Sequence, residues 1–188
     1  YVIDKTSPTA SVNIAGGLYN VTKTVTITMS KTGNIYYTLN GTTPTINSTK
    51  YIKPITISAT SVLKYLAIDL AGNKSPVYSQ TYTIDKIPPK VLSTSPKNLA
   101  TGISRTATIT LKFSENIKTS TNWSKIYVKD LTTGKIITIS KTISGSTLTI
   151  KTGKKSANQW YQIYIPAAAI KDNAGNNNTI TTFKYKTN

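Results

Sequence analysis

The 188-residue chain contains no cysteine and no histidine. These absences exclude a zinc finger, a thiolate site, a Ser-His-Asp triad and a Cys-His dyad, because each needs an imidazole or a thiol. Acidic side chains are also scarce, and the carboxylates are Asp4, Asp69, Asp85, Glu115, Asp130 and Asp172. So few scattered carboxylates leave little material for the acid–base pair of a hydrolase. The sequence therefore predicts a protein that is not an enzyme and that carries no cofactor.

Long apolar runs are missing as well. The longest, residues 163–170, is interrupted by Pro166 and falls short of the roughly 18 residues that a membrane-spanning helix needs. No stretch keeps the helical spacing of apolar side chains over three turns. We expect neither a membrane span nor a long helix in this segment.

What is present is a two-residue alternation of β-branched or aromatic residues with threonine and lysine. The alternation recurs in residues 24–29, 109–113, 126–128, 148–150, 161–165 and 183–185. This period is typical of short, half-buried strands. Asn40-Gly41, Thr133-Gly134 and Ser144-Gly145 are turn signals at the spacing of hairpins. The pattern predicts an all-β fold of two tandem antiparallel β-sandwiches, one in each half of the chain.

A repeated boundary divides the chain. Residues 1–5 read Tyr-Val-Ile-Asp-Lys, and residues 82–86 read Tyr-Thr-Ile-Asp-Lys. We interpret residues 1–5 as the tail of a preceding repeat, residues 6–87 as one domain and residues 88–188 as a second. On this interpretation the segment is an excerpt of a longer tandem array, and its lack of a signal peptide carries no information.

The joint between the domains is expected near residues 86–90. Pro88 and Pro89 lie within it. Each proline fixes its own φ and keeps the preceding residue extended, so the pair stiffens the connection.

The charge is strongly one-sided, with 23 Lys and Arg against 6 Asp and Glu and a formal net charge of +17. Residues 1–87 hold eight Lys against three Asp, whereas residues 88–188 hold 14 Lys and Arg105 against three acids. Such a surface attracts anionic cell-wall polymers, host glycans or host proteins. Nucleic acid is disfavoured, because base recognition prefers the bidentate Arg and the chain has 22 Lys but one Arg. Alternatively, lysines such as Lys112 and Lys184 lie on solvated strand faces and discourage edge-to-edge pairing.

Motifs across residues 8–85 resemble one family of Ig-like domains. They are Gly16-Gly17-x-Tyr19, Ile35-Tyr-Tyr-Thr-Leu-Asn-Gly-Thr-Thr-Pro44, Tyr51-x-x-Pro54-Ile-Thr-Ile57, Leu63-Lys64 and Ala67-Ile-Asp-Leu-Ala-Gly-Asn73-x-Ser75-Pro76. Together they resemble the C-terminal domain type of chitobiase and β-hexosaminidase. Asn40 stands where that family usually has Asp before the turn glycine, and Asn tolerates the same left-handed turn.

Residues 88–188 carry a second set of motifs. They are Pro89-x-Val91, Ser95-Pro96, Gly102-Ile103, Ile109-x-Leu111-x-Phe113-Ser-Glu115, Leu148-Thr-Ile150, Tyr161-x-Ile163 and Ile170-Lys-Asp-Asn-Ala-Gly-Asn176. This set resembles the bacterial Ig-like domain of S-layer proteins. The two domains together are similar to the stalk of large adhesin-like proteins of methanogenic archaea and some bacteria. That resemblance implies an extracellular location at the cell surface or wall and a structural or adhesive role without catalysis.

Two Asp-x-Ala-Gly-Asn loops are the candidates for a metal site. Asp69 with Asn73, and Asp172 with Asn176, offer oxygen ligands that could hold Ca²⁺. One carboxylate per loop is too few for a strong calcium site. The favoured interpretation is that each Asp caps turn N–H groups while the glycine takes a positive φ.

Five of the Asn-x-Ser/Thr triplets are candidate N-glycosylation sites in an exported protein. Their asparagines are Asn20, Asn40, Asn47, Asn122 and Asn177. Each triplet is a weak signal by itself, because the chain is rich in Asn and Thr.

Trp160 and Tyr164 are candidates for stacking on a sugar. If Tyr161 faces the core, Trp160 and Tyr164 share the outward parity, and Lys154 and Lys155 lie nearby in the sequence. The alternative is that Trp160 only covers an edge of the core.

The sequence favours a monomeric spacer segment of a surface protein, whose neighbours are other Ig-like repeats of the same chain. The rival hypothesis is a module that binds carbohydrate or cell-wall polymer through its exposed aromatic residues and lysines.

Overall fold

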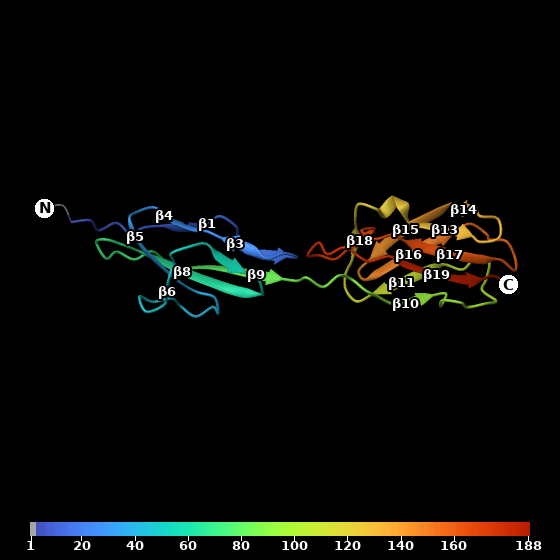
Figure 1. Cartoon of the computed structure of the whole chain (residues 1–188), viewed down its shortest axis with the longest axis horizontal. Coiled ribbons are helices and arrows are strands. Elements are labelled where there is room, and N and C mark those ends of the chain that lie inside the picture. Colours follow the sequence, from blue (N-terminus) through green and yellow to red (C-terminus); the bar gives the residue numbers. More distant parts are fainter. Residues whose placement is uncertain (1–2) are drawn as a thin grey trace. The chain divides into compact units, whose positions relative to one another are not determined.

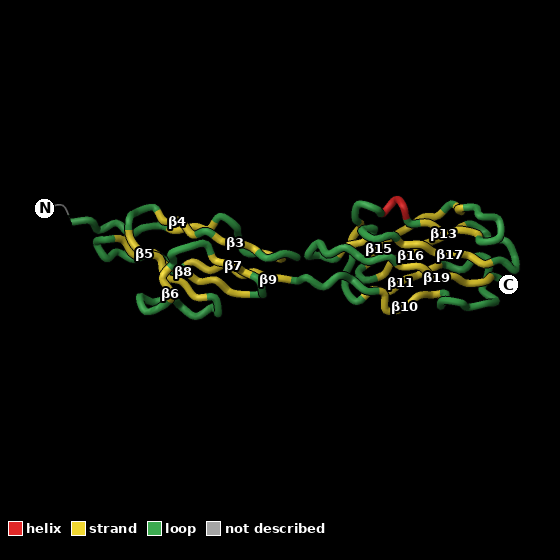
Figure 2. Tube along the Cα trace, in the orientation of Figure 1, coloured by secondary structure: helices red, strands yellow, loops and turns green. Residues whose placement is uncertain are grey.

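The computed structural model describes residues 3–188 and divides the chain into two compact units, Tyr1–Lys86 and Ile87–Asn188, called here the first and second domains. Both are built of strands, and the described residues contain no α-helix and a single 3-10 turn, η1 (Trp123–Lys125). In Figure 1 and Figure 2 the strands of each domain run side by side and are joined by loops at their ends. The expected all-β fold is confirmed.

The first domain contains a five-stranded sheet and two strand pairs. The sheet has the order β2 (Gly17–Tyr19), β9 (Tyr78–Ile84), β8 (Ser61–Asp69), β5 (Gly33–Thr38) and β6 (Thr49–Lys50). The pairs are β1 (Ala10–Val12) with β4 (Ile27–Met29), and β3 (Lys23–Val25) with β7 (Ile55–Ile57). All neighbours are antiparallel except β2 and β9, which are parallel.

One core joins the five-stranded sheet to the two pairs. Its buried residues are Ala10, Val25, Ile27, Ile35, Ile55, Ile57, Leu63, Tyr65, Ala67 and Tyr82. They occupy alternate positions of their strands, as a sheet with one solvated face requires.

The alternating run at residues 24–29 forms two strands. Val25 and Ile27 are both buried, but Val25 belongs to β3 and Ile27 to β4, and these strands pair with different partners. Between them, Thr26 N–H donates to Asn13 Oδ1 at 2.7 Å, and Asn13 N–H donates to the Thr26 carbonyl at 3.1 Å. The alternation indicates which residues are buried, whereas the change of partner depends on this distant asparagine.

The turn signals have different outcomes. Gly134 and Gly145 have φ of 72° and 55° and connect β13 to β14 and β15 to β16. Asn40-Gly41 is not the tip of a tight hairpin. Gly41 N–H donates to the Val62 carbonyl at 3.0 Å, so this turn lies against β8 at the start of a longer loop before β6.

The second domain is a sandwich of two four-stranded sheets. One has the order β10 (Val91–Ser95), β11 (Ile109–Phe113), β16 (Thr147–Thr152) and β15 (Ile139–Ser144). The other has the order β14 (Ile136–Ile137), β13 (Tyr127–Asp130), β17 (Trp160–Ile165) and β19 (Thr181–Lys186). A short pair, β12 (Lys118–Thr119) with β18 (Ile170–Lys171), completes it. Only Thr138 separates β14 from β15, so the chain changes sheets there.

The core of the second domain lies between these sheets. It contains Ile109, Leu111, Phe113, Ile117, Ile126, Val128, Leu148, Ile150, Tyr161, Ile163, Ile165, Ala169, Ile170, Phe183 and Tyr185. The strand residues of this core follow the two-residue period of the sequence, because inward positions alternate with solvent-facing ones on each strand.

The chain enters and leaves the first domain at opposite ends. Asn73 Nδ2, just after β8, donates to the Asp4 carbonyl at 3.0 Å, whereas Ile84 N–H donates to Thr60 Oγ1, just before β8, at 3.1 Å. β8 has nine residues, which is about 30 Å of extended chain.

The second domain has the same property. Lys90 is joined to Ser114, just after β11, whereas Asn158 N–H, just before β17, donates to the Asn188 carbonyl. In Figure 1, the C-terminus lies at the end of this domain opposite to the one that the chain enters.

Lys31 holds residues 4–6 against the first domain. Its Nζ lies 2.7 Å from Asp4 Oδ2 and donates to the Thr6 carbonyl at 2.6 Å. The hydrogen bond from Lys31, with others from Thr6, lowers the pKa of Asp4 well below its ordinary range. Residues 1 and 2 of the predicted tail lie outside the described residues, and the assignment of residues 1–5 to a preceding repeat stays a prediction.

Candidate binding surfaces

Strand β17 divides its residues between the core and an outward face. Tyr161, Ile163 and Ile165 are buried, whereas Trp160, Gln162 and Tyr164 alternate with them and are half-buried. Trp160 and Tyr164 therefore share one face, which is the placement that the sugar-stacking hypothesis needs.

Neighbouring strands complete this aromatic face. Tyr127 of β13 stacks on Tyr164, with ring centroids 5.0 Å apart and planes 23° apart. Lys184 Nζ of β19 lies 5.2 Å from the centre of the Trp160 ring. Sequence reasoning missed Tyr127 and the contact of Lys184, because both depend on strand register, which the alternation alone does not give. The outward aromatic rings are thus partly covered by side chains of this domain.

A hollow of about 310 Å³ lies beside Gln162 on this face. Asn98, Leu99, Thr182 and Lys184 contribute to its walls. Lys184 N–H donates to Asn98 Oδ1 at 3.1 Å, and Leu99 N–H donates to the Lys184 carbonyl at 2.7 Å. The loop through Asn98 therefore covers the outer edge of β19 and shapes one side of the hollow.

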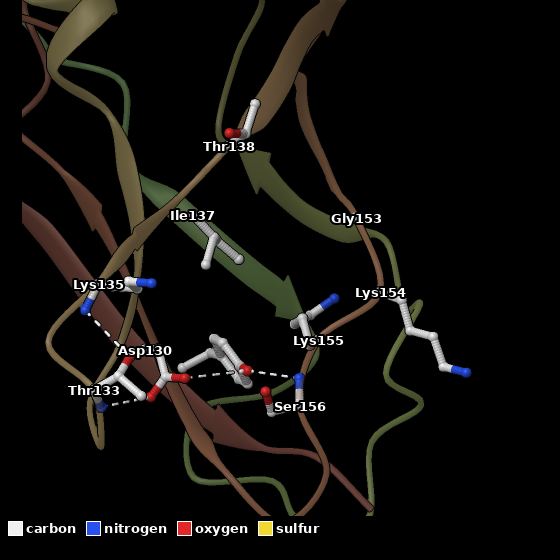
Figure 3. Close-up of a pocket in the computed structure, with 10 residues that line it drawn as sticks. Asp130, Thr133, Lys135, Ile137, Thr138, Gly153, Lys154, Lys155 and Ser156 are labelled. Carbon is white, nitrogen blue, oxygen red and sulfur yellow. Dashed lines mark hydrogen bonds between the residues drawn. The ribbon is translucent and has the colours of Figure 1, made fainter.

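A second cavity, the Asp130 pocket, has a volume of about 390 Å³. Figure 3 shows it between the end of β13, the crossing from β14 to β15 and the loop after β16. Its lining includes Asp130, Thr133, Lys135, Ile137, Thr138 and Ser156, with Tyr161 among them.

Buried polar groups form the floor of the Asp130 pocket. Tyr161 Oη accepts a hydrogen bond from Ser156 N–H at 2.9 Å and lies 3.5 Å from Asp130 Oδ2. Asp130 Oδ1 accepts from the N–H groups of Thr132 and Thr133 at 2.8 and 3.2 Å. The carboxylate thus caps the turn from β13 to β14 with one oxygen and presents the other to Tyr161.

Lys154 and Lys155 do not lie on the aromatic face of Trp160 and Tyr164. Lys154 is exposed, and its side chain extends away from the Asp130 pocket in Figure 3. Lys155 is only 3% exposed, and its Nζ donates to Thr152 Oγ1 at 2.7 Å and to the carbonyls of Arg105 and Ala107 at 3.1 and 3.3 Å. Burial lowers the pKa of Lys155. Its ammonium is engaged in the fold, so Lys155 does not belong to an exposed glycan site.

The first Asp-x-Ala-Gly-Asn loop is closed by its own hydrogen bonds. Asp69 Oδ1 accepts from Asn73 N–H at 2.8 Å, and Gly72 has φ of 85°. Lys31 Nζ lies 3.5 Å from Asp69 Oδ2. Burial by itself raises the pKa of Asp69, but the hydrogen bonds from Asn73 and the nearby Lys31 lower it on balance. A lysine ammonium at this carboxylate opposes the binding of a second cation.

The second loop is also closed by bonds to its aspartate but has a different neighbour. Asp172 is buried, and its Oδ1 accepts from the N–H groups of Gly175 and Asn176 at 2.6 and 2.8 Å. A carboxylate oxygen of Glu115 comes within 4.8 Å of one of Asp172. Sequence reasoning missed this approach, because Glu115 and Asp172 lie on distant segments. The prediction that Asp69 with Asn73, and Asp172 with Asn176, are at most weak calcium candidates stays a prediction.

The candidate glycosylation sites all lie outside strands. Asn40, Asn47 and Asn177 are exposed, whereas Asn20 and Asn122 are half-buried. Asn122 Nδ2 donates to the Ala167 carbonyl at 2.8 Å, so this amide nitrogen is engaged. The exposed three fit modification best, because their side chains reach solvent.

Within residues 3–188, no helix is long and apolar enough to cross a membrane.

Comparisons with known families agree with this architecture. Residues 85–187 match the bacterial Ig-like domain, and residues 14–79 match the chitobiase/β-hexosaminidase C-terminal domain. No curated protein sequence matches the chain. Ig-like domains are generally non-catalytic and those of bacteria are typically extracellular or surface-displayed, whereas the second family takes its name from enzymes.

Solved structures of tandem domains also resemble the chain. The crystal structure of Rst D1-D2 is 12% identical with a TM-score of 0.46, and the match covers 95% of this chain and 99% of that one. The fibronectin(III)-like modules of Clostridium thermocellum CbhA are 14% identical with a TM-score of 0.41, covering 95% and 94%.

The two matched regions follow one another in the order that the sequence motifs indicated, and each falls on one of the two β-sandwich units. The chain therefore belongs to the bacterial Ig-like domain family through its second domain, which follows a domain of the chitobiase/β-hexosaminidase C-terminal type.

Proposed function

We propose that this chain is a non-catalytic spacer of an extracellular, adhesin-like surface protein and projects a distal binding region from the cell. The observation that carries this proposal is that the chain enters and leaves each domain at opposite ends. Tandem copies of such a domain add length with every copy, whereas domains with adjacent termini do not.

The composition supports the same role. A net charge of +17 keeps neighbouring copies apart and soluble. Two separate hydrophobic cores, one per domain, allow each unit to fold without the other. The bacterial Ig-like family supports an extracellular or surface location.

Small-angle X-ray scattering on the chain tests the spacer. We expect a maximum dimension close to that of two domains placed end to end. A maximum dimension close to that of two domains packed side by side would overturn the proposal. A variant with two glycines in place of Pro88 and Pro89 is the control, and its distance distribution should broaden because the joint loses its fixed φ values.

A second candidate function is binding of carbohydrate or cell-wall polymer. It is favoured by the outward face of Trp160, Gln162 and Tyr164 with the lysine Lys184 beside it. Aromatic faces stack on sugar rings, and lysines attract anionic polymers.

Retention on purified wall polymer and on a neutral polysaccharide separates the two candidates. Binding that disappears by a few tenths molar salt indicates diffuse attraction to lysines. Retention that survives salt and is lost in Trp160→Ala establishes the second candidate. Tyr36→Ala, which removes a half-buried aromatic residue of the first domain, is the matched control. If the chain is not retained even at low salt, the spacer is the one candidate function that remains.

A further inference from the structure

The Asp130 pocket presents an acceptor that the fold does not fully use. Asp130 is only 5% exposed. Within residues 3–188, the one hydrogen bond to its Oδ2 comes from Tyr161 Oη over 3.5 Å, whereas Oδ1 accepts two shorter ones. A carboxylate oxygen accepts about two hydrogen bonds. Oδ2 therefore retains capacity for a donor placed in the pocket.

The walls carry alcohol groups around one apolar side chain. The hydroxyls of Thr138 and Ser156 line the pocket and make no hydrogen bond to another described residue. Ile137 is half-buried and lies between Thr138 and Lys135 in Figure 3. A sugar ring matches such a lining, because it offers hydroxyl groups at its edge and C–H groups on its face.

The pocket has an acidic group at its floor and lysines at its rim. Lys135 and Lys154 are both exposed residues of the lining, but the Lys154 side chain extends away from the pocket in Figure 3, so Lys135 is the lysine available at the rim. Lys155 also lines the pocket but directs its ammonium to Thr152 and to backbone carbonyls, so it is not free for a ligand. A simple anion would meet attraction at the rim and repulsion from Asp130 at the floor. A neutral sugar would donate a hydrogen bond to Asp130 at the floor but would form no ion pair with a lysine at the rim.

We propose that the Asp130 pocket binds one sugar unit that carries an anionic group, with a sugar hydroxyl donating to Asp130 Oδ2 and the acidic group pairing with Lys135. The volume of about 390 Å³ lies within the range of small-ligand sites. This site is separate from the aromatic face, and it stands whether or not the chain is a spacer.

Titration of the chain with glucuronate, followed by amide ¹⁵N–¹H spectra at roughly 0.15 M salt, tests the proposal. Glucose and inorganic phosphate serve as comparison ligands. We expect saturable shifts confined to the amides of Thr133, Lys135 and Ser156 and their neighbours. Glucuronate should bind about tenfold more tightly than glucose, because one charge-assisted hydrogen bond is added. Phosphate should cause no saturable shift at these amides.

Two lysine variants separate a site from general positive charge. Lys135→Ala should weaken glucuronate binding about tenfold, whereas Lys151→Ala, which removes an exposed lysine of β16 outside the pocket, should leave it unchanged. Asp130→Asn keeps an oxygen for the N–H groups of Thr132 and Thr133 and should reduce the affinity for both sugars. If Asp130→Asn does not fold, Ser156→Ala replaces it, because that side chain makes no hydrogen bond within the described residues.

Specific outcomes would overturn the proposal. One is the absence of saturable shifts at the pocket amides with glucuronate. Another is an equal loss of affinity in Lys135→Ala and Lys151→Ala, which would mean diffuse charge. Equal binding of glucose and glucuronate would show that the acidic group does not contribute to recognition. Tighter binding of phosphate than of glucuronate would show that the sugar ring does not contribute.

Discussion

Lys155 is the most informative of the 22 lysines, because it is almost wholly buried. Lysines are rarely buried unless their ammonium is paired. Here three oxygen acceptors surround Nζ, two of them backbone carbonyls of the segment before β11. The ammonium thus ties that segment to the loop after β16.

Replacing Lys155 should destabilise the second domain. We expect Lys155→Met to lower its free energy of unfolding by about 1–3 kcal/mol, because the carbonyls of Arg105 and Ala107 lose a buried donor. Lys154→Met, at the exposed neighbouring position, should change it by about 0.5 kcal/mol or less. Urea unfolding measures both values. Equal effects at the two positions would show that the buried bonds contribute nothing beyond the cost of burying the charge.

Tyr82 makes the first domain sensitive to alkaline pH. Burial, with smaller contributions from Tyr19 and Tyr65, raises the pKa of Tyr82 to about 12. The pKa of an unfolded tyrosine is about 10. Because the folded pKa is the higher one, the stability from the neutral phenol is complete below pH 10 and is lost as the pH rises towards 12.

The melting temperature of the first domain should therefore fall between about pH 10 and pH 12. Tyr82→Phe should make that fall shallower, although it also lowers stability at neutral pH by removing the 2.7 Å hydrogen bond to the Ile14 carbonyl. Thermal melts across this pH range, together with phenolate absorbance, measure the effect. An unchanged pH profile in the variant would assign the alkaline sensitivity to other tyrosines.

Gly33 of β5 lies directly against the backbone of β8 and leaves no room for a side chain. A Cβ atom at this position would lie 2.1 Å from the Ile68 carbonyl oxygen, which is backbone and cannot rotate away. The two strands pair from Gly33 to Thr38, so a side chain here would force the whole pairing apart or bend it.

Gly33→Ala should destabilise the first domain by about 3 kcal/mol, as overpacking against fixed backbone does. Gly72→Ala is the matched substitution in a loop, where a Cβ would meet nothing within 4 Å and only the positive φ of 85° opposes it. That change should cost about 1 kcal/mol. Urea unfolding of both variants measures the difference, and a milder effect at Gly33 than at Gly72 would contradict this account of the strand contact.

Each of the two domains has a core of its own, and no residue of one core belongs to the other domain. We expect two unfolding transitions in calorimetry. Tyr65→Ala should lower the first-domain transition, because it opens a cavity where the side chain is 2% exposed, and should leave the second-domain transition in place.

Phe113→Ala, at another position that is 2% exposed, should have the opposite effect and lower only the second-domain transition. A single transition that both variants shift together would show that the domains unfold as one cooperative unit.

Much of the architecture could be predicted from the sequence. The absence of His and Cys excluded whole classes of site, and the two-residue alternation indicated strands and the inward residues of β17, such as Tyr161 and Ile163. These features are local, because side chains of a strand alternate between its faces whatever the strand pairs with. The family motifs likewise indicated two Ig-like domains.

Contacts between distant segments were decided only by the tertiary structure. Tyr127 on Tyr164, the Asp130 pocket and the approach of Glu115 to Asp172 each depend on strand register or on loops that meet across a sheet. Lys155 shows the limit most clearly, because it lies beside Lys154 in the sequence and differs from it only in what surrounds it after folding. Alternation along a strand is a property of the chain, whereas burial of a particular charge depends on which oxygens the rest of the fold brings to it.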